Sequence, residues 1–153
     1  MFTDFTIIVE DKEISVHSVI LAQSSNVFET AIKSNFKEKQ SKSILIEDFH
    51  YYIVLNAITF IYMQILLNEH YLFELLQFSD KYNICTLHSY VQQALIKKIN
   101  LSNLFDLINI AENLNAKQLS ATCISFASSN LIYVKQQSYW RTLDDSIARK
   151  ILG

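Results

Sequence analysis

The chain contains no proline, and its single glycine is the last of its 153 residues. Glycine and proline make many tight turns and end many helices, so a chain without them favours long helices joined by polar turns. Half of the residues are hydrophobic, which is ample for a packed core. The length suits one domain, or one domain with a small appendage.

Charge and cysteine content narrow the functional classes. The net charge is −2, without the basic excess of a nucleic-acid-binding face, so we expect no nucleic-acid partner. Cys85 and Cys123 are too few for a disulfide framework, and the N-terminal MFTDFTII lacks the basic region and long apolar core of a signal peptide. We therefore expect a reduced, intracellular protein of the cytoplasm, the nucleus or both.

One long stretch carries no charge: Asp, Glu, Lys and Arg are all absent between Asp48 and Glu69. Its length would suffice to span a bilayer, but polar residues interrupt it and no Lys/Arg cluster flanks it. We expect a buried helix and no membrane contact. The residues that mark this helix are Tyr51, Leu55, Ile58 and Tyr62.

The N-terminal third predicts a hairpin and two helices. Apolar residues alternate along residues 5–16, with Asp11-Lys12 at the midpoint as the turn. A short helix over residues 18–25 is expected to have Val19, Ile20 and Ala22 on its apolar side. Asn26 and Glu29 have capping-box spacing, so a second helix should begin at Asn26. Its expected apolar face comprises Val27, Phe28, Ala31 and Ile32.

A polar segment, SNFKEKQSKS at residues 34–43, follows the second helix. Apolar periodicity stops before it and restarts at Ile44 with the predicted strand SILIED, so we expect a loop. Its one large apolar residue is Phe36. Either this ring folds back as a lid on the helix end, or a partner covers it.

Residues 72–95 and 104–127 repeat one pattern at an offset of 32 residues: LFELLQFSDKYNICTLHSYVQQAL and LFDLINIAENLNAKQLSATCISFA. Each copy predicts a helix, a tight turn at an Asn and a second helix, with Asn83 and Asn115 at the turns. Because equal spacing presents the same apolar stripe twice, stacked helical hairpins would bury both stripes. The alternative is that any two amphipathic hairpins look alike.

The order of these elements resembles a known family. DFTIIVEDKEISVHSVILAQSSNVFETAI, which begins at Asp4, is similar to the opening of a BTB/POZ domain. The likeness continues through ILIEDF, the long helix and the first helical hairpin (LLQFSDKYNICTLHSYVQQAL), and spans residues 3–99. Residues 100–140 resemble the BACK or three-box helical extension of ubiquitin-ligase adaptors. The resemblance implies an α+β fold: a small sheet flanked by a helical cluster at residues 1–99, then a stacked helical extension at residues 100–153.

The resemblance also implies a docking site. Many BTB adaptors bind the scaffold protein cullin-3 through an apolar residue, any residue and an acidic residue after the second helix of this core. Those positions are similar to Phe36, Lys37 and Glu38. Phe36 would fill a pocket on cullin-3, and Glu38 would accept hydrogen bonds. The likeness adds Tyr82 as a partner-binding residue and implies structural roles for Asp4, His17 and Asp80.

Three departures from the family bear on assembly. The sequence begins at Met1, without the strand and helix that precede Asp4 in swapped homodimers, and it has no YTG after the long helix, which casts doubt on a further short strand. Ser18 stands where dimeric members often have Lys or Arg, so we expect Asp4 to be an unpaired, buried carboxylate, which is unfavourable. We therefore expect a monomer or a weak dimer, with other BTB proteins as possible partners.

No residue pattern predicts catalysis or a cofactor. His17 is expected to be a hydrogen-bonded core histidine, because no base-and-nucleophile arrangement surrounds it. Cys85 and His88 have C-x-x-H spacing but lack two further ligands, so we expect no metal, and Cys123 reads as a small core residue. The sequence thus predicts a non-enzymatic adaptor that binds cullin-3. The alternative is a scaffolding or oligomerisation module for a transcriptional or cytoskeletal partner, without cullin binding.

Overall fold

The fold is seen in a computed structural model that describes residues 2–37 and 41–153, with side chains given throughout these ranges except at residues 35–37. The chain divides into two compact units, Met1–His88 and Ser89–Gly153. The first contains β1 (Phe5–Val9), β2 (Lys12–Val16), α1 (Ser18–Ser24), α2 (Asn26–Lys37), β3 (Ser43–Leu45), α3 (Tyr51–Met63), α4 (Leu72–Lys81) and the start of α5 (Cys85–Ile96). The second contains the end of α5, α6 (Leu104–Asn113), α7 (Lys117–Ser129), α8 (Leu131–Gln136), the 3-10 helix η1 (Ser138–Thr142) and α9 (Asp145–Leu152).

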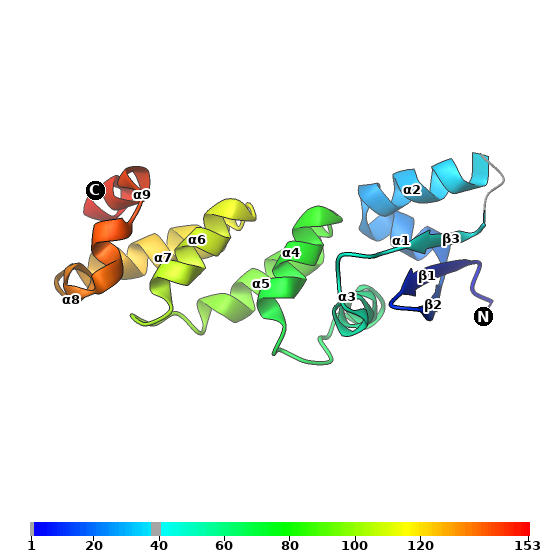
Figure 1. The fold of residues 1–153 in the computed structure, drawn as a ribbon, viewed down its shortest axis with the longest axis horizontal. Helices are drawn as coiled ribbons and strands as arrows, with labels where there is room; N and C mark the ends of the chain where they lie inside the picture. Colours follow the sequence, from blue (N-terminus) through cyan, green and yellow to red (C-terminus); the bar gives the residue numbers. More distant parts are fainter. Residues whose placement is uncertain (1, 38–40) are drawn as a thin grey trace. The chain divides into compact units, whose positions relative to one another are not determined.

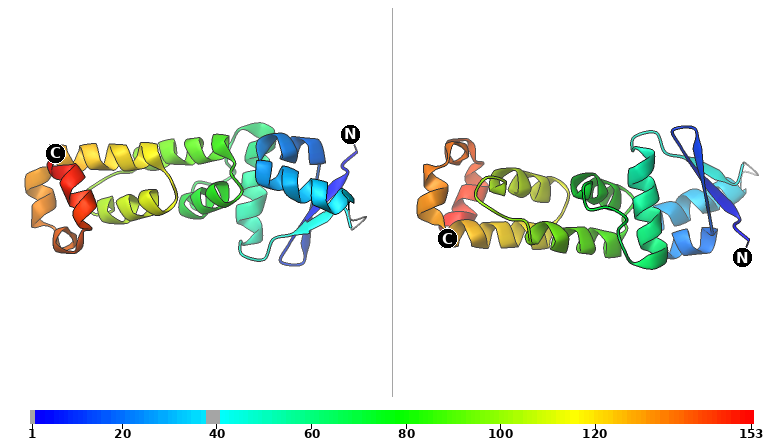
Figure 2. Two further views of the ribbon diagram at one scale, coloured as in Figure 1. Left: turned by 90° about the horizontal axis from the view of Figure 1, so that it is seen from above. Right: turned by 90° about the horizontal axis from the view of Figure 1, so that it is seen from below.

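A three-stranded sheet of order β2-β1-β3 organises the first unit. β1 pairs antiparallel with β2 and parallel with β3, so that Ile7 lies opposite Ile14 on one side and Ile44 on the other. Phe5, Ile7 and Val9 alternate into the core, and α1 and α2 lie next to each other beside the sheet (Figures 1 and 2). A small sheet with a helical cluster confirms the predicted α+β class.

The hairpin turn lies one residue earlier than predicted. Val9 pairs with Lys12, so the two loop residues are Glu10 and Asp11, with φ values of 50° and 61°. Positive φ at both positions is the mark of a type I′ turn, whose twist matches that of the flanking strands. The alternation of apolar residues predicted the hairpin correctly, but it carries no information on which polar pair reverses the chain.

Three details of α1 and α2 differ from the prediction. In α1 the buried residue is Leu21, whereas Val19 is 61% exposed. The residue that caps α2 is Ser25, not Asn26: the Ser25 hydroxyl accepts the N–H of Phe28 at 3.0 Å and donates to the carbonyl of Tyr82. A buried hydroxyl that satisfies two backbone groups outcompetes the exposed amide beside it.

The helix α2 also extends further than expected, to Lys37, so the predicted loop of residues 34–43 begins only after it. The hydroxyl of Ser34 donates to the Thr30 carbonyl at 3.0 Å, as expected of a serine within a helix. Ile32 is buried, whereas Lys33 and Ser34 are exposed, so polar residues continue the helix where the apolar pattern weakens. The strand predicted over SILIED is confirmed for its first three residues, Ser43–Leu45.

The uncharged stretch forms α3, a buried helix as predicted, although most of the residues that marked it in the sequence are not themselves buried. Of the four residues named, only Ile58 is buried, and Tyr62 is exposed. A helix that is apolar almost all round has no periodicity that selects one face. Among the described helices, none is both long and apolar enough to cross a membrane. The residues buried in α3 are Ile53, Val54, Asn56, Ala57, Ile58, Phe60 and Ile61.

The repeat is present in the structure at the predicted offset. The helices α4 and α6 begin at Leu72 and Leu104, and their hairpins turn at Asn83 (φ 49°) and Asn115 (φ 55°). The bonds that close the turns are equivalent: Ile84 N–H to the Ser79 carbonyl, and Ala116 N–H to the Ala111 carbonyl, both at 2.9 Å. These six-to-one bonds around a left-handed residue define the Schellman motif that ends a helix. Stacking of the two hairpins stays a prediction.

A buried glutamine caps α7, the second helix of the second helical hairpin. The residue before α7 is Ala116, which has no side-chain acceptor. The carboxamide oxygen of Gln92, in α5, accepts instead from the N–H groups of Gln118 at 3.0 Å and Leu119 at 3.1 Å. Gln92 is almost fully buried. A polar side chain is tolerated at this buried position because the first N–H groups of a helix need acceptors from outside the helix.

The left-handed turn predicts how Asn115 responds to substitution. Asn115→Ala should be about 1 kcal/mol less stable than Asn115→Gly, because only glycine adopts positive φ without steric strain. Both variants lose the same side chain, so their difference reports the backbone alone. Urea denaturation followed by circular dichroism measures it, and equal midpoints would contradict the left-handed assignment.

The cap predicts a contrast between neighbouring glutamines. Gln92→Ala should lower the free energy of unfolding by about 1–2 kcal/mol, as loss of a helix cap typically does. Gln93, whose amide meets the Gln118 side chain at the surface, is the matched control. Gln93→Ala should stay within about 0.5 kcal/mol of the parent. A Gln92 variant as stable as the control would show that the cap does not contribute to the free energy of unfolding.

Candidate partner-binding surface

The predicted docking triplet lies at the end of α2. Phe36 and Lys37 belong to the helix, while their side chains and the whole of Glu38 lie outside the described residues. The triplet therefore starts in the last turn of a helix and not, as expected, within a loop. Both alternatives for Phe36, a docking anchor or a lid, stay predictions.

Asp4 is an exposed residue with hydrogen-bond partners, which corrects the expectation of an unpaired buried carboxylate. Its two carboxylate oxygens accept the Ser18 N–H at 2.7 Å and the Ser18 hydroxyl at 2.6 Å. These two bonds, led by the hydroxyl, hold the pKa of Asp4 below its ordinary value. Ser18 is the first residue of α1, and its preceding residue offers no side-chain cap. Asp4 thus supplies the acceptor that this helix start needs.

His17 connects the sheet to α3 through a tyrosine. The hydroxyl oxygen of Tyr62 accepts the backbone N–H of His17 at 2.8 Å and lies 2.8 Å from Nδ1 of the same residue. The tautomer of the imidazole decides whether the hydroxyl donates to Nδ1 or accepts from it. Nε2 is buried and has no partner among the described residues. The histidine as a whole is half-buried.

Tyr82 sits in an aromatic cluster. Its ring stacks on Phe28 with centroids 4.7 Å apart and lies 4.6 Å from Phe78, which meets Phe49 edge to face at 5.0 Å. Tyr82 is only 7% exposed, and burial raises the pKa of its hydroxyl. The partner-binding role stays a prediction, but it has to act through this small exposed edge. Asp80, two residues earlier in α4, is half-buried.

The cysteines and histidines form no evident metal site. Cys85 is exposed, with its thiol 3.6 Å from the Asn83 carboxamide oxygen. Cys123 is fully buried, and burial raises the pKa of its thiol to about 11, which keeps it protonated. Within residues 2–37 and 41–153, no group of three or more His, Cys, Asp or Glu side chains could hold a metal ion.

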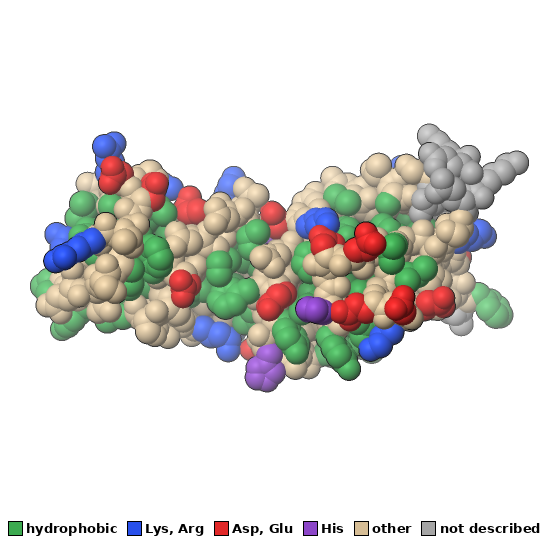
Figure 3. Space-filling model, viewed as in Figure 1, with side chains coloured by type: hydrophobic (Ala, Val, Ile, Leu, Met, Phe, Trp, Pro, Cys, Tyr) green, Lys and Arg blue, Asp and Glu red, His purple; other side chains and the backbone are tan. Residues whose placement is uncertain are grey.

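The surface of the first unit carries paired charges and scattered apolar side chains. Acidic side chains gather over this unit in Figure 3. Asp48 forms an ion pair with Lys81, and Glu10 is hydrogen-bonded to Nδ1 of His50 at 2.6 Å. Glu10 also accepts the N–H of Tyr51 at 3.0 Å, and so caps α3. The exposed apolar side chains include Val19, Val27, Leu45, Tyr52, Met63, Ile65 and Leu67.

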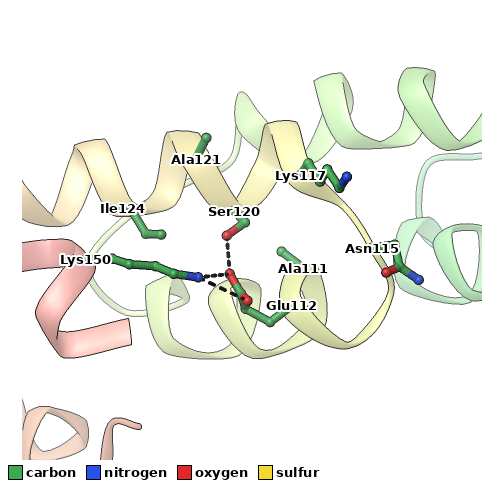
Figure 4. Close-up of a pocket in the computed structure, with 8 residues that line it drawn as sticks. All are labelled: Ala111, Glu112, Asn115, Lys117, Ser120, Ala121, Ile124 and Lys150. Carbon is green, nitrogen blue, oxygen red and sulfur yellow. Dashed lines mark hydrogen bonds and ion pairs between the residues drawn. The ribbon is translucent and has the colours of Figure 1, made fainter. Parts of the chain in front are cut away.

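A cavity of about 380 Å3 opens in the second unit between α6, α7 and α9 (Figure 4). Glu112 accepts the Ser120 hydroxyl at 2.5 Å, and both of its oxygens lie 3.5 Å from the Lys150 ammonium. This cluster ties α9 to the hairpin. The sequence could not predict it, because Lys150 is distant along the chain from Glu112.

Comparison with known proteins identifies the family of this chain. A family model described as BTB/POZ domain matches residues 1–99, more than half of the chain. The chain belongs to the BTB/POZ domain family. BTB domains are non-enzymatic modules that mediate protein–protein interactions and dimerisation. The matched range ends at residue 99, so the BACK-like nature of residues 100–140 stays a prediction.

Curated relatives align with almost the whole chain. BTB and MATH domain-containing protein 42 of Caenorhabditis elegans is 30% identical over 150 residues, which are 95% of this chain and 37% of that protein. BTB and MATH domain-containing protein 40 of the same organism is 29% identical over 148 residues, or 91% of this chain and 37% of that protein. The chain therefore spans little more than a third of the length of these relatives.

Solved BTB structures share the fold. The BTB domain of zebrafish PATZ1 superposes with a TM-score of 0.55 at 15% identity, covering 63% of this chain and 77% of that one. The BTB domain of human gigaxonin gives a TM-score of 0.53 at 22% identity, covering 60% and 76%. At these identities the likeness establishes the BTB fold alone.

The Asp4–Ser18 contact predicts a pH-dependent effect of Ser18→Ala. A carboxyl pKa that is lower in the folded state stabilises the fold above the unfolded pKa, and this stabilisation is lost as the pH falls through the folded pKa. Ser18→Ala should therefore have a lower free energy of unfolding than the parent at pH 7. This difference should shrink as the pH falls through the pKa of Asp4 in the folded protein. Carboxyl-carbon NMR should show the Asp4 pKa rising in the variant. An unchanged Asp4 pKa would mean that the hydroxyl does not hold the carboxylate.

Proposed function

We propose that this BTB chain is a protein–protein interaction adaptor that docks on the ubiquitin-ligase scaffold cullin-3 through Phe36, Lys37 and Glu38. The observation that carries the proposal is the combination of a BTB domain over residues 1–99 with an apolar-x-acidic triplet at the end of α2. Among the described residues, no reactive site suggests a different function. The BTB/POZ family is also one of interaction modules.

The chemistry of the triplet suits a docking anchor. A phenylalanine gains free energy when it leaves water and fills a preformed pocket, and a few such anchors dominate most interfaces. A glutamate two residues later accepts hydrogen bonds from a helix start or a basic side chain of the partner, which fixes the orientation of the anchor.

We further propose that residues 100–140 act as a BACK or three-box-like extension of the docking surface. The alignments with the two BTB and MATH proteins run over 148 and 150 residues, so relatives keep this segment next to their BTB domain. Both relatives are named for a MATH domain as well. Recruitment of a substrate would then depend on another segment of the full protein or on a partner subunit, in the cytoplasm or the nucleus.

The second candidate is a scaffolding or oligomerisation module that binds another BTB protein and not cullin-3. Dimerisation is a property of the family. Exposed apolar side chains on elements of the first unit, Val19 in α1, Val27 in α2 and Leu45 in β3, favour this alternative because they could be covered by another BTB domain.

The adaptor proposal predicts binding to the N-terminal domain of cullin-3 and its loss in Phe36→Ala. The variant should weaken binding by about 2 kcal/mol or more, roughly thirtyfold, as truncation of a central aromatic anchor does. Glu38→Ala should weaken it by about 1–3 kcal/mol, because it leaves polar partners unpaired. Isothermal titration calorimetry measures both affinities.

Val27→Ala is the matched control, since it removes an exposed apolar side chain from the same helix. Its affinity for cullin-3 should stay within about threefold of the parent. If Phe36→Ala lowers the melting temperature and leaves binding unchanged, the ring is a lid. If the parent chain itself does not bind cullin-3, the adaptor proposal is wrong and the scaffolding alternative stands.

A further inference from the structure

The two most exposed large hydrophobic side chains of the second unit lie on the short helix α8. Ile132 is 74% exposed and Tyr133 is 58% exposed, although the next residue, Val134, is fully buried. Lys135 follows Ile132 by three residues, so both side chains lie on one face of the helix. The ammonium of Lys135 also lies 6.0 Å from the centroid of the Trp140 ring, in η1. Apolar, aromatic and cationic groups are therefore neighbours on this surface.

The segment after α8 is anchored to the α6–α7 hairpin. The ring of Tyr139 stacks on Phe105 of α6 with centroids 5.5 Å apart, and its hydroxyl donates to the Leu101 carbonyl at 3.2 Å. The helices α8 and η1 also contact each other. Because the fold holds these groups in place, little entropy is lost in ordering them when a partner binds. We call the following residues the α8–η1 surface: Ile132, Tyr133, Lys135, Trp140 and Arg141.

The α8–η1 surface carries positive charge without a counter-charge. The second unit has seven Lys and Arg residues and four Asp and Glu residues, a net charge of +3; since the whole chain has −2, the first unit has −5. Lys135 and Arg141 are exposed, and neither forms an ion pair within the described residues. Two of the four carboxylates are engaged elsewhere, Glu112 with Lys150 and Asp144 at the start of α9. A negatively charged ligand is therefore attracted to this surface.

We propose that the α8–η1 surface binds an acidic segment of a partner protein, one that presents a bulky apolar side chain between carboxylates. The apolar side chain packs on Ile132 and Tyr133, which removes two exposed apolar groups from water. The carboxylates meet Lys135 and Arg141, whose guanidinium bonds a carboxylate through two N–H groups. The surface lies at the end of the segment that we propose to extend the cullin-3 docking surface, but this binding needs no residue of the docking triplet.

The number of cations on the surface favours a protein over other polyanions. Attachment to anionic lipid takes clusters of about four to eight Lys and Arg residues. Nucleic acid is held by several cations that each neutralise a phosphate. Here two cations without ion-pair partners accompany exposed apolar and aromatic side chains, which suits a few carboxylates around an apolar group. Segments in which acidic and hydrophobic residues alternate have this chemistry.

The test titrates the full chain with a peptide in which Asp and Glu alternate with Leu and Phe. Trp140 is the only tryptophan of the chain, so its fluorescence reports contact with this surface, and isothermal titration calorimetry gives the affinities. Saturable binding is expected, and it should weaken at high salt because exposed ion pairs are screened. Lys135→Glu and Arg141→Glu should each weaken it by about fivefold or more, and Ile132→Ala by about threefold or more.

Two variants separate this proposal from cullin-3 docking. Arg141 lies outside residues 100–140, so Arg141→Glu should lose affinity for the peptide and keep its affinity for cullin-3. Phe36→Ala should keep its affinity for the peptide. If Arg141→Glu weakens cullin-3 binding and leaves peptide binding unchanged, the surface belongs to the docking site and the proposal is wrong.

Lys97→Glu is the matched control, because it makes the same change of charge at an exposed lysine of the second unit, just after α5. It should bind the peptide within about twofold of the parent at physiological salt. An equal loss in this control would overturn the proposal, since net charge alone would explain the binding. Equal affinity for a peptide with Asn and Gln in place of Asp and Glu would overturn it, as would the absence of saturable binding.

The same fluorescence signal tests the other possible occupants. A response of Trp140 to phosphatidylserine vesicles but not to the peptide would assign the surface to a membrane. A change in Trp140 fluorescence on dilution of the chain alone, without a response to the peptide, would assign it to a second copy. Either result would overturn the proposal.

Discussion

The described chain depends on left-handed backbone at positions where no glycine is available. Five non-glycine residues take positive φ, and each stands at a reversal of the chain: Glu10, Asp11, Gln64, Asn83 and Asn115. Asn and Asp tolerate this conformation better than other non-glycine residues, because their short polar side chains bond locally. Glu and Gln need compensation from elsewhere. The structure provides this compensation through hydrogen bonds that the side chains of these turn residues make.

Glu10 turns the β-hairpin and, with the same side chain, bonds His50 and the N–H of Tyr51 at the start of α3. Gln64 ends α3 and returns its amide to the Phe60 carbonyl. Asn83 turns the first helical hairpin and holds Asn26 at the start of α2. Each of these three residues is thus fixed by a hydrogen bond that also orders a helix end, which couples the turns to the packing of the first unit.

Side chains from outside the helix also satisfy the first N–H groups of several of the described helices. Asp4 serves α1, Ser25 serves α2, Glu10 serves α3 and Gln92 serves α7. The residues before α4, α6 and α8 offer no side-chain cap.

Local patterns in the sequence determined the elements, the helical repeat and the BTB family, because alternation, helical periodicity and an Asn at a fixed offset depend on residues close together in the chain. Only the tertiary structure decided the caps and the buried faces. Asp4 and Ser18, Gln92 and Gln118, and Glu112 and Lys150 are pairs whose members meet through folding. The buried face of α3 was undecided for a related reason, since an almost uniformly apolar helix acquires an inside only when its neighbours pack against it. Whether a polar side chain is paired or orphaned depends on which distant residue reaches it, and no local pattern contains that information.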